Sequence, residues 1–114
     1  MIDKNVLLNI ALFKKYPVSF VHFVTSRCNA RCSFCFIDFD NPITYKNELT
    51  IKEIEKISKS LGPTISNINL TGGEPFARKD FTEIADLYFK NSAAKSIYIT
   101  TNGSLPDRIK KFVN

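Results

Sequence analysis

Three apolar segments rich in β-branched and aromatic residues recur along the chain, and a short polar motif follows each of them. The segments cover residues 18–25, 65–70 and 96–100. Their length and composition predict strands buried in a parallel sheet. Helical patterns lie before and between them, so the predicted order is helix, then βα, βα and β. This alternation predicts an α/β fold with parallel β/α units, whose ligands bind beyond the carboxyl ends of the strands.

Capping signals mark the two helices between the strands. Thr50 and Glu53 form a T-x-x-E capping box in front of an apolar repeat, and the pair 62–63, Gly-Pro, ends that repeat. Asp80 and Glu83 have the same spacing, so we expect Asp80 to cap the second helix.

Two further helices are predicted near the ends of the chain. Residues 5–15 have apolar positions at helical spacing, and we expect an N-terminal helical extension over residues 1–17 in front of a βα part over residues 18–114. After the third strand, Ser104 is a candidate cap and Pro106 is suited to a first helical turn.

Three cysteines lie within eight positions directly after the first predicted strand. Cys28, Cys32 and Cys35 have C-x3-C-x2-C spacing on one loop, which lets thiolates approach neighbouring irons of one cluster. No fourth cysteine exists, so one iron would stay open to a small molecule, which favours chemistry over electron transfer alone. An odd cysteine count fits a reducing compartment better than a disulfide framework, and we expect a cytoplasmic protein.

Two other interpretations of the cysteines remain. A structural zinc site needs four ligands, and the only histidine, His22, lies inside the predicted strand, six residues before Cys28. Cysteines can also be small buried apolar residues, but Arg27, Asn29 and Arg31 make this loop polar. The zinc module is therefore the less favoured alternative.

Two more motifs follow the second and third strands. Gly72 and Gly73 permit a sharp turn and a close approach of backbone to a ligand, and the nearby Glu74 carboxylate favours an ammonium group. Thr101 and Asn102 carry a hydroxyl and an amide that can hydrogen-bond a ribose or a substrate. Each motif alone is also a common turn sequence.

The three motifs together, in this order after three consecutive strands, resemble the radical SAM superfamily over residues 18–103. The resemblance implies a [4Fe-4S] cluster and S-adenosylmethionine (SAM) as cofactors. The glycine motif is then expected at the SAM amino group and an aromatic side chain beside the adenine. The implied ligands are, for the cluster, Cys28, Cys32 and Cys35 and, for SAM, Phe34, Gly72, Gly73, Glu74 and Thr101.

The resemblance also implies a reaction. A one-electron reductant that is similar to flavodoxin or ferredoxin reduces the cluster, and SAM is cleaved at its sulfonium. The resulting 5′-deoxyadenosyl radical abstracts hydrogen from a substrate that the sequence does not identify. This cleavage demands no side-chain acid or base.

The family's fold is a partial (β/α)6 TIM-like barrel, and the chain has room for half of it. Six units of about 30 residues need on the order of 180 residues, whereas the chain has 114. We expect a truncated core of three βα units, the last one incomplete, with the apolar inward face of its strands partly open. A catalytically inactive iron–sulfur fragment is therefore the first alternative to an enzyme.

Composition gives no support to two other classes of partner. The 16 Lys and Arg residues outnumber the 11 Asp and Glu residues, but they are scattered, which disfavours a nucleic-acid interface. No stretch approaches the roughly 20 apolar residues that span a bilayer. We expect neither nucleic acid nor a membrane as a partner.

The loop between the cysteines and the next helix carries four more polar side chains. We expect most of them to be solvated, and they are Asp38, Asp40, Tyr45 and Glu48.

Overall fold

A parallel three-stranded sheet lies at the centre of the computed structural model, which describes residues 4–12 and 16–114. The strands are β1 (Ser19–Phe23), β2 (Asn67–Thr71) and β3 (Ser96–Ile99), and their order in the sheet is β1-β2-β3. Both neighbouring pairs are parallel. The predicted α/β class with parallel β/α units is confirmed. Closure of such units into a barrel stays a prediction.

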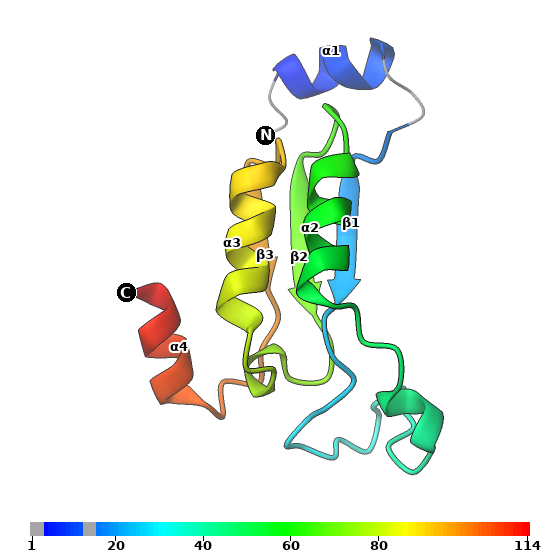
Figure 1. Ribbon diagram of the computed structural model, residues 1–114, viewed down its shortest axis with the longest axis vertical. Helices are drawn as coiled ribbons and strands as arrows, with labels where there is room; N and C mark the ends of the chain where they lie inside the picture. The colour runs from blue at the N-terminus through cyan, green and yellow to red at the C-terminus, as the bar shows by residue number, and fades with distance from the viewer. Residues whose placement is uncertain (1–3, 13–15) are drawn as a thin grey trace.

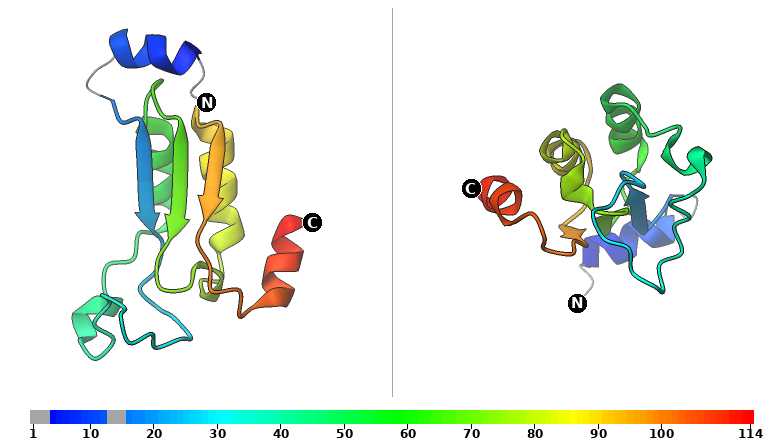
Figure 2. Two further views of the ribbon diagram at one scale, coloured as in Figure 1. Left: turned by 180° about the vertical axis from the view of Figure 1, so that it is seen from behind. Right: turned by 90° about the horizontal axis from the view of Figure 1, so that it is seen from below.

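Helices cover one face of this sheet and leave the other face open. In Figure 1, α2 (Ile51–Ser60) and α3 (Phe81–Asn91) lie in front of the strands, and the rear view in Figure 2 shows the strands uncovered. Beyond β3 lies α4 (Pro106–Val113), whereas α1 (Lys4–Leu12) crosses the end of the sheet where the strands begin. The expected helix over 5–15 therefore ends at Leu12 within the described residues, and residues 13–15 lie outside them.

None of the described helices is long and apolar enough to cross a membrane.

The start and end of α2 match their sequence signals. The Glu53 amide donates to Thr50 Oγ1 over 3.3 Å, and the Thr50 amide donates to Glu53 Oε2 over 2.7 Å, so the predicted capping box is present. Gly62 follows the helix with a φ of +82°, a conformation that favours glycine. Local chemistry therefore sets both ends of this helix.

The other two predicted caps are wrong, because each side chain is engaged by a residue two positions before it and not by the helix that follows. Asp80 makes no capping hydrogen bond to α3. Its carboxylate instead accepts from Arg78 Nε over 2.6 Å. Ser104 does not cap α4 either, since its hydroxyl donates to Asn102 Oδ1 over 2.6 Å.

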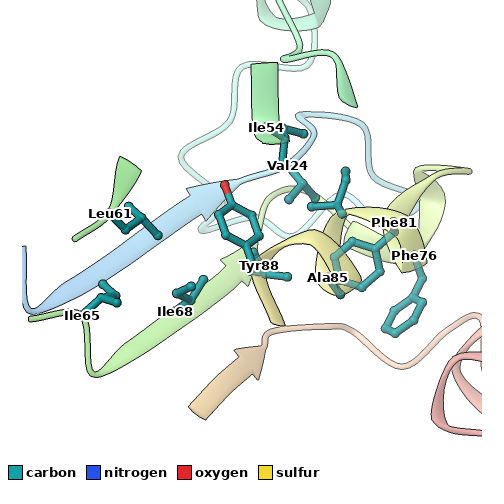
Figure 3. Packing of buried hydrophobic residues seen from close by; sticks show 11 residues of the cluster. Val24, Ile54, Leu61, Ile65, Ile68, Phe76, Phe81, Ala85 and Tyr88 are labelled. Carbon is teal, nitrogen blue, oxygen red and sulfur yellow. The ribbon is translucent and has the colours of Figure 1, made fainter. Parts of the chain in front are cut away.

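The hydrophobic core fills the layer between the helices and the sheet (Figure 3). Ile54 of α2, Ile68 and Leu70 of β2, and Ile84 and Tyr88 of α3 are all fully buried. Burial of each such side chain contributes about 1.5–3 kcal/mol to folding. This layer holds the strands side by side, and their carboxyl ends therefore meet at one rim.

The open face of the sheet carries both apolar and polar side chains. Val21, Phe23 and Tyr98 are 51%, 52% and 59% exposed on it, and the half-buried Asn67 and Asn69 alternate with the buried residues of β2. The prediction of a buried first strand is wrong for most of β1, since helices cover one face of the sheet only. We also expected the open inward face of the strands to be apolar. That expectation is wrong, because Asn67 and Asn69 of the middle strand lie between its apolar residues.

A buried polar pair joins β1 to α3. His22 Nδ1 and the Tyr88 hydroxyl lie 2.9 Å apart, and His22 is only 7% exposed. Burial, and next the positive charge of Arg78, lower the pKa of His22 from 6.5 to about 4. Burial also raises the pKa of Tyr88 to about 12. Both side chains are therefore neutral near pH 7.

This pair predicts a loss of stability in mild acid. Unfolded His22 takes up a proton below pH 6.5, whereas folded His22 does so only near pH 4. The free energy of unfolding should thus fall by roughly 1.4 kcal/mol per pH unit across this window as the pH is lowered. Urea denaturation between about pH 5 and pH 7 measures the slope. The double variant His22→Phe/Tyr88→Phe leaves no polar partner behind and should lose this slope; an unchanged slope would contradict the assignment.

Candidate functional site

The segments that follow β1 and β2 stay paired beyond the ends of the strands. The Gly73 amide donates to the Thr25 carbonyl over 2.8 Å, and the Glu74 amide donates to the Arg27 carbonyl over 2.8 Å. The glycine motif therefore lies directly against the start of the cysteine loop. The residues that these hydrogen bonds join are more than 40 positions apart in sequence.

Only glycine fits at positions 72 and 73. A Cβ atom on Gly72, whose φ is +154°, would lie 2.4 Å from the Thr25 carbonyl oxygen. A Cβ atom on Gly73 would lie 2.2 Å from the Arg27 carbonyl oxygen and 2.9 Å from Cys28 Cβ. Both distances are far below van der Waals contact, so the two glycines permit the close approach of the cysteine loop.

The Glu74 carboxylate joins the glycine motif to the segment after β3. Thr101 Oγ1 donates to its Oε1 over 2.7 Å and the Asn102 amide donates to its Oε2 over 2.8 Å, while the Phe76 amide donates to Oε1 over 3.2 Å. The side chain of Glu74 is fully buried. Its oxygens are therefore engaged by the protein, and they stabilise the rim.

Cys28 is the cysteine that the rim holds in place. It is half-buried, and its sulfur accepts from the Ala30 amide over 3.4 Å. Asn102 Nδ2, from the segment after β3, lies 4.0 Å from the same sulfur. Cys28 thus contacts residues of two predicted motifs.

Cys32 and Cys35 lie farther along the loop and are exposed, as is Phe34 at 89%. Within residues 4–12 and 16–114, no three His, Cys, Asp or Glu side chains are grouped so as to hold a metal ion. The structure thus brings the three cysteines onto one loop but not to one point, and their role as ligands stays a prediction. The contact of Phe34 with an adenine also stays a prediction.

The histidine considered for a zinc site lies elsewhere. His22 is under the helical layer against Tyr88, as described above. It is part of the buried pair, so the structure gives no support to a fourth zinc ligand from this side chain.

Glu48 anchors the far end of the cysteine loop to its beginning. Its carboxylate accepts a short hydrogen bond from the Thr25 hydroxyl and forms an ion pair with Arg27 at 2.8 Å. Burial acts to raise the pKa of Glu48, but these hydrogen bonds and the charge of Arg27 outweigh it and lower the pKa below its usual value. The expectation of a solvated side chain holds for Asp38 and Asp40, which are exposed, but not for Glu48.

Arg78 holds the ends of the same loop from inside the protein. Its guanidinium is 6% exposed and donates to the carbonyls of Val24, over 2.6 Å, and Leu49, over 2.7 Å. The hydrogen bond from Arg78 is also the main cause of a lowered pKa of Asp80. A buried cation with three engaged partners fixes where the loop leaves β1 and where it enters α2.

The sequence interpretation missed these anchors. Thr25, Glu48 and Arg78 carry no motif, and their partners lie far away along the chain. Arg78 stands two residues before Asp80, which is the one local hint of an ion pair. The remaining contacts depend on the register of the sheet, which no local pattern reveals.

The site is an open rim beside two pockets. Pockets of 530 Å³ and 960 Å³ lie along α3 and α4, and none of their lining residues belongs to the cysteine or glycine motifs or to the segment 100–103. The first pocket includes Phe76, Arg78 and Arg108. These pockets are therefore neighbours of the site and not part of it.

A comparison with known protein families shows what this chain is similar to. The model described as the Radical SAM superfamily matches residues 22–114. The match begins at His22, near the end of β1, and continues through the cysteine loop and α4 to Asn114.

The close approach at Gly73 can be tested by adding one methyl group. Gly73→Ala should lower the free energy of unfolding by about 1–3 kcal/mol, since the methyl group must displace the cysteine loop. It should also speed alkylation of the half-buried Cys28, measured by mass spectrometry. Gly62→Ala is the control, because its methyl group would meet the Tyr16 ring, and Gly62 precedes β2, whereas the cysteine loop pairs with the segment after β2. Equal alkylation rates of Cys28 in both variants and the wild type would argue against this displacement.

Proposed function

The chain belongs to the Radical SAM superfamily, and on that premise we propose that it binds a [4Fe-4S] cluster and SAM for reductive cleavage of SAM. Cys28, Cys32 and Cys35 are the proposed cluster ligands. The substrate, which would lose a hydrogen atom, is not identified by this proposal.

One observation carries the proposal: hydrogen bonds join the three motifs to one another. Backbone hydrogen bonds join the Gly72–Gly73 segment to the start of the cysteine loop. The Glu74 carboxylate joins it to Thr101 and Asn102. A turn that served only to reverse the chain would need no such connection. The connections support a single site at the carboxyl ends of the strands.

The donor chemistry of the loop fits an iron–sulfur cluster. All three cysteines are free thiols on one segment, and thiolates are the ligands that iron–sulfur clusters prefer. When bound, the cluster and SAM would supply the chemistry, which is one-electron cleavage of the sulfonium to a 5′-deoxyadenosyl radical. The protein would contribute the thiolates and the anchors Glu48 and Arg78, which keep both ends of the loop at the rim.

The rim also suggests how the protein shares the binding of SAM. The carboxylate of Glu74 is buried and engaged, so we propose that it holds the motif in shape, and that the backbone at Gly72 and Gly73 receives the SAM amino group. The Thr101 hydroxyl donates its hydrogen bond to the Glu74 carboxylate. It would therefore contact SAM only as an acceptor, and Phe34 would have to turn toward the adenine.

Two parts of the proposed reaction need more than this chain's own residues provide. The electron would come from a flavodoxin- or ferredoxin-like reductant. Hydrogen abstraction also needs a site that is shielded from water, whereas the face with Val21, Phe23 and Tyr98 is open. A cluster-binding fragment without turnover is therefore the alternative.

Anaerobic reconstitution tests the proposal. We expect about four irons per chain, and the EPR signal of the reduced protein should change when SAM is added. Cys28→Ala, Cys32→Ala and Cys35→Ala should each lose most of this iron, because each removes one of three ligands. Ser33→Ala changes a residue of the same loop without removing a thiol, so this variant should keep its iron.

The outcomes separate the alternatives. A cluster signal that ignores SAM would reject the SAM site and leave the cluster-binding fragment. A colourless protein that retains one zinc would reject the cluster itself.

A further inference from the structure

Three polar side chains form a closed ring between the cysteine loop and the segment after β3. Asn102 Nδ2 donates to Asn29 Oδ1 over 3.0 Å, and Asn29 Nδ2 donates to Ser104 Oγ over 2.6 Å. Ser104 Oγ in turn donates to Asn102 Oδ1 over 2.6 Å. We call Asn29, Asn102 and Ser104 the amide ring. It joins two segments that are more than 70 residues apart.

The amide ring lies at the surface and is joined to the interior of the protein through the backbone of Asn102. The Asn102 amide donates to the buried Glu74 carboxylate over 2.8 Å, and the Ser104 amide donates to Asn102 Oδ1 over 2.9 Å. The side chain of Asn102 has both of its polar atoms engaged. Its orientation is therefore set by the rim and not by solvent.

This orientation directs one N–H group at a proposed cluster ligand. Asn102 Nδ2 lies 4.0 Å from Cys28 Sγ, which already accepts from the Ala30 amide over 3.4 Å. Within the described part of the chain, no hydrogen bond reaches the sulfur of Cys32 or Cys35. The three thiols thus differ, and the sulfur of Cys28 alone has N–H donors.

We propose that Asn102 is a positioning residue that orients Cys28 and raises the reduction potential of the cluster that Cys28 would bind. This inference rests on the proposed function. An N–H donor stabilises negative charge on a ligand sulfur, and reduction adds an electron to the cluster, so the donor favours the reduced state. A higher potential makes reduction by a given donor protein easier.

The test compares Asn102→Ala with Ser104→Ala in the reconstituted full chain. The first variant removes the donor but keeps the backbone contact to Glu74, whereas the second removes a ring hydroxyl and keeps the amide. Midpoint potentials come from an EPR-monitored redox titration, together with the iron content. We expect Asn102→Ala to lower the ratio of reduced to oxidised cluster about tenfold at a fixed potential, which is a negative shift of 59 mV for one electron. Ser104→Ala should give a smaller negative shift.

The outcomes decide the matter. An unchanged or higher potential in Asn102→Ala with full iron content overturns the inference and leaves the proposed function intact. If Asn102→Ala holds no cluster, Ser104→Ala decides: a negative shift supports the inference and an unchanged potential overturns it. A wild-type chain that takes up no iron overturns both proposals.

Discussion

The buried carboxylate of Glu74 connects the turn after β2 to the segment after β3. Glu74 follows β2, and its two oxygens accept from the backbone of its own turn and from Thr101 and Asn102 after β3. A buried carboxylate is costly without such donors, and removing donors would leave that cost uncompensated. The conformation of the turn and the position of the next segment therefore depend on each other.

The second constraint is steric and acts on the other side of the same turn. Gly72 and Gly73 let the backbone after β2 continue to pair with the backbone after β1, where any Cβ atom would overlap with a carbonyl oxygen. The cysteine loop can therefore start against the turn. The segments after β1, β2 and β3 meet at one rim for two reasons. Glu74 accepts hydrogen bonds from the segment after β3, and Gly72 and Gly73 have no side chains that would keep the segment after β1 away.

Cys28 shows what this arrangement does for the cysteine loop. The loop is long and mostly exposed, and Cys32 and Cys35 lie in its outer part. Its two ends are fixed by Arg78 from inside and by Glu48 across the rim. Cys28 lies at a fixed end, next to Asn102, whereas the other two thiols lie in the exposed part of the loop.

Local chemistry along the chain was enough to predict the parallel α/β class, the capping box of Thr50 and Glu53 and the place of the three motifs after the strands. These features depend on neighbours in sequence, so a local pattern records them. The partners of Glu74, Glu48, Arg78 and Asn29 could not be predicted this way. Apart from the local contacts of Arg78 with Asp80 and of Glu74 with Phe76, these partners lie tens of residues away, and the parallel register brings the groups together. The half-open face of the strands was also decided by tertiary structure, because exposure depends on which layers pack against a strand and not on its composition.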